Sequence, residues 1–153
     1  MSYTNADGLF TLTGTAKGDP KNNGGMLNAV KWLVVEIPDA TLLGAAQVAP
    51  TPNDAFIPAG SYITAATFIT TTAFTSGGSG TLGIGLFTAA NAAIDADGID
   101  AAIAKGALAA DTVVLCNGAL VGGTAGVGAA NAYVGVLQAT AVFTAGAGKL
   151  VIE

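Results

Sequence analysis

Short apolar runs alternate with turn-forming residues along most of this chain, and this spacing most constrains its fold. Stretches such as 31–37, 61–74, 81–88 and 132–137 carry large or β-branched side chains at alternate positions. Gly, Pro and Asn interrupt such runs at roughly eight to twelve residue intervals, which is typical of short antiparallel strands. The pattern predicts about eight to ten strands and an all-β fold, a jelly-roll-like β-sandwich with one short helix.

The clearest strand covers residues 31–37 and ends at Pro38. A strand points successive side chains to opposite faces. One predicted face carries Leu33, Val35 and Ile37, and the other carries Trp32, Val34 and Glu36.

Residues 54–103 form the organising stretch of the predicted domain. Ile57-Pro58-Ala59-Gly60 predicts a type II turn, and a strand at 61–74 follows. Alternation along this strand places Tyr62, Thr64, Ala66 and Phe68 on one predicted face. The other predicted face carries Ile63, Ala65, Thr67 and Ile69. Residues 76–80 predict a hairpin-like connection into a strand at 81–88. Gly83 and Gly85 leave one face of that strand without side chains, so we expect another part of the molecule to pack flat against it.

Residues 97–109 predict the one helix, with Asp97 as its cap and Ile99, Ala102, Ile103 and Leu108 as its apolar stripe. A strand at 112–116, a hairpin turn at Asn117-Gly118 and a strand at 119–121 follow. A Gly-rich loop at 122–130 leads to strands at 132–137 and 139–144. An Ala-Gly turn then precedes a final strand at 149–153.

The first part of the chain differs in composition from the rest. Residues 8–13 predict a short strand, and 14–25 are polar and rich in Gly, Asn and Lys. We therefore assign 1–25 to an N-terminal strand and polar arm, and 26–153 to the β-sandwich domain; 40–53 give no clear prediction. No secretory signal is visible at the N-terminus.

Charge is scarce, at 10% of residues against 52% hydrophobic ones, and the chain has no Arg or His. Without a basic patch, nucleic-acid binding through phosphates is not expected. The segments 55–94 and 112–148 contain no charged side chain. Polar residues and glycines interrupt both, so we expect no membrane span. About a quarter of the surface of a soluble monomer is usually charged, so these segments predict contact with other protein chains. The alternative is a small neutral monomer that Thr, Asn and Ser keep in solution.

No residue pattern predicts catalysis or a cofactor. A chain without His has no Ser-His or Cys-His pair, and the single Cys116 is expected to be a buried structural thiol. Gly78–Gly83 matches a dinucleotide fingerprint only by chance, because it precedes a strand. Asp95, Asp97 and Asp100 fail the EF-hand spacing and are interpreted as a turn and helix cap, although their binding of a cation stays open. We therefore predict no catalytic, cofactor-binding or metal-binding residue and no enzyme activity.

Four motifs carry a resemblance to a known class of proteins. They are Phe56–Ile63 followed by an Ala/Thr-rich strand, Ala73–Gly78, Asp95–Asp100 and Gly148–Glu153. Together they resemble small virion structural proteins of tailed bacteriophages, of the capsid decoration (cement) type, with phages of aquatic bacteria and cyanophages closest. The resemblance implies a β-rich homo-oligomer, with a trimer favoured over a dimer, bound where capsomers meet. It implies no catalytic residue.

These observations predict a non-enzymatic protein on the outer capsid surface of the virion. Its partner would be the major capsid protein, which it would stabilise by bridging capsomers. Two alternatives stay open: a phage head-fibre or tail base domain, and a calcium- or carbohydrate-binding β-sandwich module.

Overall fold

The computed structural model describes residues 2–4, 10–12, 32–37 and 56–153. The chain divides into two units, residues 1–31 and 32–153. In the first unit, β1 (Ser2–Thr4) pairs antiparallel with β2 (Phe10–Leu12), which confirms the centre of the strand predicted at 8–13. The predicted polar arm at 14–25 and the residues 40–53 lie outside the described residues. The boundary predicted after residue 25 stays a prediction.

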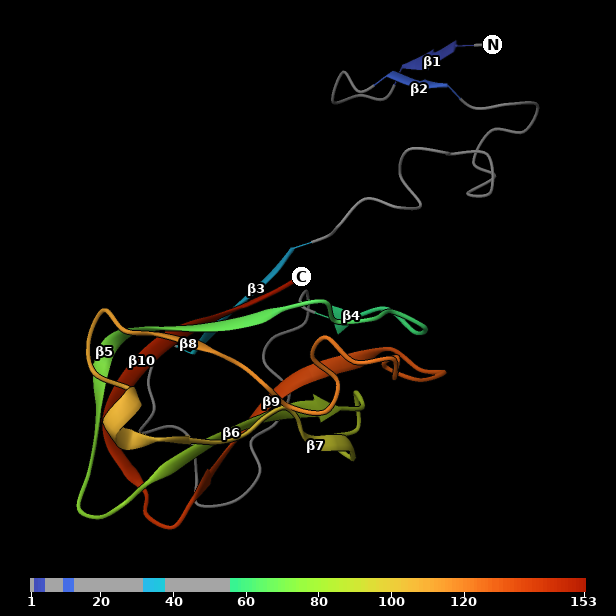
Figure 1. Ribbon diagram of the computed structural model, residues 1–153. Coiled ribbons are helices and arrows are strands. Elements are labelled where there is room, and N and C mark those ends of the chain that lie inside the picture. Colours follow the sequence, from blue (N-terminus) through green and yellow to red (C-terminus); the bar gives the residue numbers. More distant parts are fainter. Residues whose placement is uncertain (1, 5–9, 13–31, 38–55) are drawn as a thin grey trace. The chain divides into compact units, whose positions relative to one another are not determined.

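The second unit is built from two four-stranded antiparallel sheets (Figure 1). The first sheet has the order β3-β10-β5-β8, from β3 (Leu33–Ile37), β10 (Phe143–Ile152), β5 (Ala66–Ser76) and β8 (Val113–Leu115). The second sheet has the order β4-β9-β6-β7, from β4 (Phe56–Ile57), β9 (Ala132–Ala139), β6 (Thr81–Phe87) and β7 (Ala93–Ala104). Consecutive strands lie in different sheets, except β6 and β7. This arrangement is consistent with the predicted all-β sandwich.

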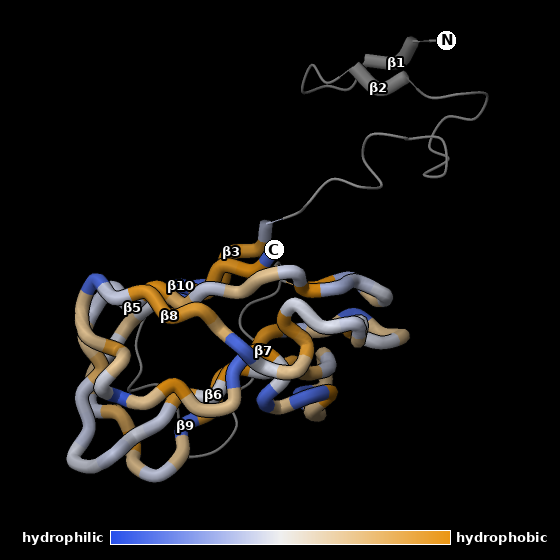
Figure 2. Tube along the Cα trace, in the orientation of Figure 1, coloured by the Kyte–Doolittle hydropathy of each residue, from blue (hydrophilic) through white to orange (hydrophobic). Residues whose placement is uncertain are grey.

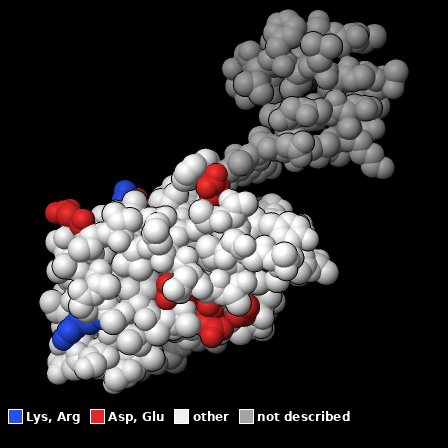
Figure 3. Space-filling model, viewed as in Figure 1, with Lys and Arg blue, Asp and Glu red and all other residues white. Residues whose placement is uncertain are grey.

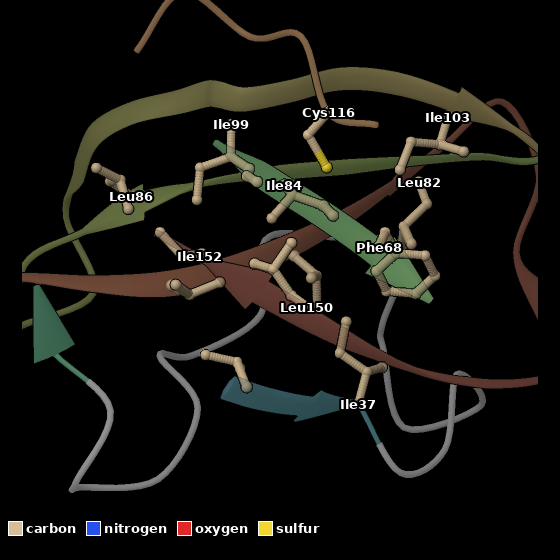
Figure 4. Packing of buried hydrophobic residues seen from close by; sticks show 14 of the residues in the cluster. Ile37, Phe68, Leu82, Ile84, Leu86, Ile99, Ile103, Cys116, Leu150 and Ile152 are labelled. Carbon is tan, nitrogen blue, oxygen red and sulfur yellow. The ribbon is translucent and has the colours of Figure 1, made fainter. Parts of the chain in front are cut away.

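Apolar side chains from both sheets form one core (Figure 4). Phe68 on β5 and Leu150 on β10 face this core from the first sheet, and Leu82 and Ile84 on β6 face it from the second. All four are fully buried. Burying side chains of this size contributes about 1.5–3 kcal/mol each, so the shared core holds the two sheets together.

The predicted alternation is confirmed in β3 and corrected at the start of β5. In β3, Val35 and Ile37 are buried, whereas Val34 and Glu36 are exposed. The strand predicted from residue 61 begins at Ala66 instead. Before this strand, Ile63 forms an isolated parallel bridge with Val121, and its side chain is buried. Ile63 and Ala66 are both buried although they are three residues apart, so the predicted alternation is interrupted between them.

The turn at Pro58 is confirmed in kind but displaced by one residue. The Ser61 N–H donates to the Pro58 carbonyl at 3.1 Å, and Gly60 has φ +75°. A positive φ at the third residue is the requirement of a type II turn. Pro58 is therefore the first residue of this turn and not the second.

The hairpin predicted at 76–80 was wrong. The segment carries the chain from β5 in the first sheet to β6 in the second, so the strands on either side of it do not pair. The Lys105 ammonium donates hydrogen bonds to the carbonyls of Ser76 (3.3 Å) and Gly78 (2.8 Å), and these bonds stabilise the connection. Spacing along the chain cannot distinguish such a crossing from a hairpin.

The helix predicted at 97–109 was also wrong, because these residues continue β7 and end in a 3₁₀ turn, Lys105–Ala107. Of the predicted apolar stripe, Ile99, Ile103 and Leu108 are buried, whereas Ala102 is exposed. Residues four apart share one face in a strand and also in a helix, so the spacing of Ile99 and Ile103 does not distinguish the two structures. Pairing with β6 decides the outcome. Asp97 therefore caps no helix.

Two later connections also differ from prediction. Asn117-Gly118 makes no hairpin, since neither residue has the positive φ that such a turn needs, and 119–121 form no strand beyond the Val121 bridge. Gly118 instead lies against β7, where a Cβ would meet the Gly98 carbonyl oxygen at 2.4 Å. The segment predicted as a strand at 139–144 contains the end of β9, a turn and the start of β10. The predicted Ala-Gly turn lies inside β10, which has irregular pairing there.

Candidate interaction surface

The outer face of the first sheet carries two rows of side chains that cross all four strands. The sheet register places them directly opposite one another. In the order β3-β10-β5-β8, the first row is Val34, Val151, Thr67 and Leu115, and the second is Glu36, Lys149, Ile69 and Val113. We call these eight residues, together with Trp32 just before β3, the first-sheet face.

This face exposes large apolar side chains. Four of the eight large hydrophobic side chains exposed among the described residues belong to it: Leu115 at 76%, Trp32 at 67%, Val113 at 60% and Val34 at 52%. Figure 2 colours β3 and β8, the two edge strands of this sheet, as hydrophobic. Contiguous apolar patches on a soluble domain mark sites of interaction, whereas scattered single residues do not.

The charges on the first-sheet face neutralise each other. The Lys149 ammonium lies 3.0 Å from the Glu36 carboxylate, and both side chains are about half exposed. An exposed pair of this kind contributes at most about 1 kcal/mol to folding. Because Lys149 and Glu36 pair with each other, the first-sheet face has no net charge and presents no unpaired ion to a partner.

The outer face of the second sheet is covered by its own chain. Gly85 on β6 and Gly135 on β9 lie opposite each other on this face. A Cβ on Gly135 would lie 2.2 Å from the Phe87 ring, and a Cβ on Gly85 would lie 2.2 Å from the Ala96 carbonyl. Phe87 is fully buried although it lies outside the core between the sheets. The prediction that something packs flat against the glycines of β6 is therefore confirmed.

A bulge in β7 supplies part of this cover. Ile84 and Leu86 on β6 are two residues apart, whereas their partners Asp100 and Asp95 on β7 are five apart. The additional residues arch away from the regular ladder, as in a β-bulge. They bring Ala96 over Gly85, so the bulge seals this sheet.

A second surface, which contains no charged residue, lies at the loops around β4. The Gly60 N–H donates to Gly128 and the Val127 N–H donates to Ser61, both at 2.8 Å, which joins segments 56–65 and 119–133 side by side. Neither segment contains a charged residue. Tyr62 and Phe56 are exposed here, and the Phe56 ring lies 6.3 Å from that of Tyr133. We call these two segments the loop end.

The three aspartates that the sequence left open as a cation site lie on β7 and differ in environment. Asp97 is exposed, Asp95 is half-buried and Asp100 is buried, where its Oδ1 accepts the Ala102 N–H at 3.1 Å. Burial, followed by the interaction with Asp97, raises the pKa of Asp95. Within the described residues, no group of three His, Cys, Asp or Glu side chains is arranged to hold a metal ion.

Cys116 is buried among core side chains, as predicted. Burial, with a smaller effect of Asp100, raises the pKa of this thiol to about 12. A thiol must lose its proton to act as a nucleophile, so Cys116 is unreactive near neutral pH.

Comparison with known proteins gives no match to a family model, to a curated protein or to a solved structure. The search for helices long and apolar enough to cross a membrane also finds none among the described residues.

Sequence reasoning found one strand of the first-sheet face and missed the face as a whole. The alternation at 31–37 placed Trp32, Val34 and Glu36 together, which the exposed β3 side chains confirm. Leu115 and Val151 join them only because β8 and β10 come into the same sheet from distant parts of the chain. The available signal was the absence of charge from 112–148, which includes β8 and β9.

Proposed function

We propose that this protein is a non-enzymatic virion structural protein that decorates the outer surface of a phage capsid and links neighbouring capsomers. The observation that carries the proposal is the presence of two surfaces without net charge, the first-sheet face and the loop end. A protein that bridges other subunits needs two contact surfaces. It needs no reactive centre.

The small number of charged groups supports this proposal. Figure 3 shows charged atoms in a few small groups, separated by a broad neutral surface. Exposed apolar side chains on such a surface favour contact with protein over contact with polyanions. In the proposed arrangement the loop end contacts the major capsid protein, and the first-sheet face is left for a second protein contact.

We further propose that residues 32–153 form a jelly roll. Numbered within this unit, the eight strands give sheet orders 1-8-3-6 and 2-7-4-5. This is the order produced when the strand pairs 1 with 8, 2 with 7, 3 with 6 and 4 with 5 are rolled into two sheets. Double-sheet folds of this kind occur in viral capsid and lectin domains. The strand order therefore supports a structural role but does not by itself carry the function.

The copy number of the protein in virions tests this function. Particles purified from a lysate of the phage that encodes the chain are digested, and the protein is quantified by mass spectrometry against the most abundant shell protein. We expect the two to be present in the same order of magnitude. Absence of the chain, or a few copies per particle as for a fibre or tail component, would overturn the proposal.

A further inference from the structure

The first-sheet face remains uncovered by any other described part of the second unit, although it is built like a core-facing surface. Six of the eight residues in its rows are Val, Ile, Leu or Thr, the side chains that normally pack between two sheets, and the other two form the Glu36–Lys149 ion pair. Two sheets stack with about 10 Å between them when both present flat, apolar faces. A partner for this face therefore needs a flat apolar sheet of its own.

We propose that this partner is a second copy of the same chain, packed through the same face. A second copy offers a sheet of matching width and chemistry, and a pair of identical faces closes after two subunits. The inference does not depend on the virion assignment, since it concerns only how copies of this chain meet.

The distribution of charge favours this occupant. The whole chain carries a net charge of −5, which opposes association in general. The β7 aspartates belong to the second sheet, so contact through the first sheet does not bring the two acidic groups together. On the face itself, Glu36 is already paired with Lys149, and β3 is an edge strand. Lys149 lies on the neighbouring inner strand β10, and both side chains are accessible to water.

The size of the face sets the strength of the contact. Four strands about 4.8 Å apart, contributing three residues in β8 and about five in β3 at 3.3 Å per residue, outline roughly 200–300 Å² in plan. Stable dimers bury about 800 Å² on each partner. We therefore expect a weak pair, with a dissociation constant of about 10 µM to 1 mM. Such a contact becomes effective when many copies are held side by side, as on a regular lattice.

Sedimentation equilibrium of the full chain tests this inference over protein concentrations of about 10 µM to 1 mM. We expect the apparent mass to rise from the single-chain value of 14.8 kDa toward twice that value. Val34→Gln and Leu115→Gln, on opposite edge strands of the face, should each weaken association at least about tenfold. Val142→Gln is the matched control, because Val142 is as exposed as Val34 but lies outside the face.

Unfolding curves of all three variants establish that each is folded. A mass that stays at one chain over the whole range would overturn the inference, whatever else covers the face. Association that persists in both face variants, or that Val142→Gln weakens equally, would also overturn it. A limiting mass of three chains would contradict the pairwise contact.

Discussion

The two sheets of the second unit share one core, but the outer face of one sheet is covered and that of the other is exposed. On the outer face of the second sheet, positions 85 and 135 are glycines, and Phe87 and the β7 bulge pack against them. The first sheet keeps large apolar side chains, including Val34 and Leu115, and leaves them exposed. The described residues of the second unit seal one sheet and leave the other open, and we infer that the open sheet serves contact with another protein.

Gly85→Ala gives the largest expected effect and tests the sealed sheet. The new Cβ would lie 2.2 Å from the Ala96 carbonyl carbon and oxygen, which are backbone atoms that cannot move without shifting the bulge. We expect the free energy of unfolding in urea to fall by about 3 kcal/mol. Gly77→Ala is the control, since no atom lies within 4 Å of its Cβ position. Equal stability of the two variants would mean that the bulge does not seal the sheet.

Val35→Ala and Val34→Ala compare the two sides of the open sheet at adjacent positions of β3. Val35 is 2% exposed, so its truncation removes core contacts and should lower the free energy of unfolding by about 2 kcal/mol. Val34 faces outward, and its truncation should change the free energy of unfolding by less than about 0.5 kcal/mol in dilute monomer. Equal losses in chemical denaturation would show that the outer face is covered within a single chain.

Thr70→Val should stabilise the protein from the inner side of the first sheet. The Thr70 hydroxyl is buried on β5 and has no hydrogen-bond partner among the described residues. Valine has nearly the same shape and buries no polar atom, so we expect a gain of about 1 kcal/mol in thermal or urea unfolding. Thr71→Val, at the exposed neighbouring position, should change stability by less than about 0.5 kcal/mol. A loss of stability in Thr70→Val would show that the hydroxyl has a partner.

Asp95→Asn gives the smallest expected effect and concerns the β7 bulge. The pKa of Asp95 is raised on folding from its ordinary value of 3.8, mainly by burial. A raised carboxyl pKa means that the folded state favours the protonated form, so this group destabilises the fold once the pH exceeds the folded pKa. The variant should therefore melt slightly higher than wild type at pH 7, and the difference should vanish below pH 3.8. A difference that grows on acidification would contradict this assignment.

Local patterns predicted the strands but not their partners. The alternation at 31–37 predicted both faces of β3, because a period of two needs no knowledge of the rest of the chain. Both faces carry large apolar side chains, however, so the pattern alone does not say which one is buried. The connection at 76–80 and the pairing of β3 with β10 depend on contacts between distant segments. The first-sheet face was beyond prediction for the same reason, since four separate segments build it.

The prediction of β7 failed for a different reason. Ala-rich sequence and the spacing of Ile99 and Ile103 favour a helix locally, and Asp97 is a good helix cap. In the fold, β6 offers these residues a pairing partner, and the bulge over Gly85 uses the segment that the sequence assigns to the start of the helix. Tertiary pairing outweighs such local preferences, which amount to less than about 1 kcal/mol per residue.

The most direct measurement uses Trp32, the only tryptophan of the chain, which lies on the first-sheet face with 67% of its surface exposed. Its fluorescence can be recorded on unmodified protein over the concentrations at which mass is measured. We expect its emission to shift to shorter wavelength, and its quenching by acrylamide to decrease, in step with the rise in mass. An increase in mass that leaves both signals unchanged, or no increase in mass, would contradict the claim that the open sheet is the contact surface.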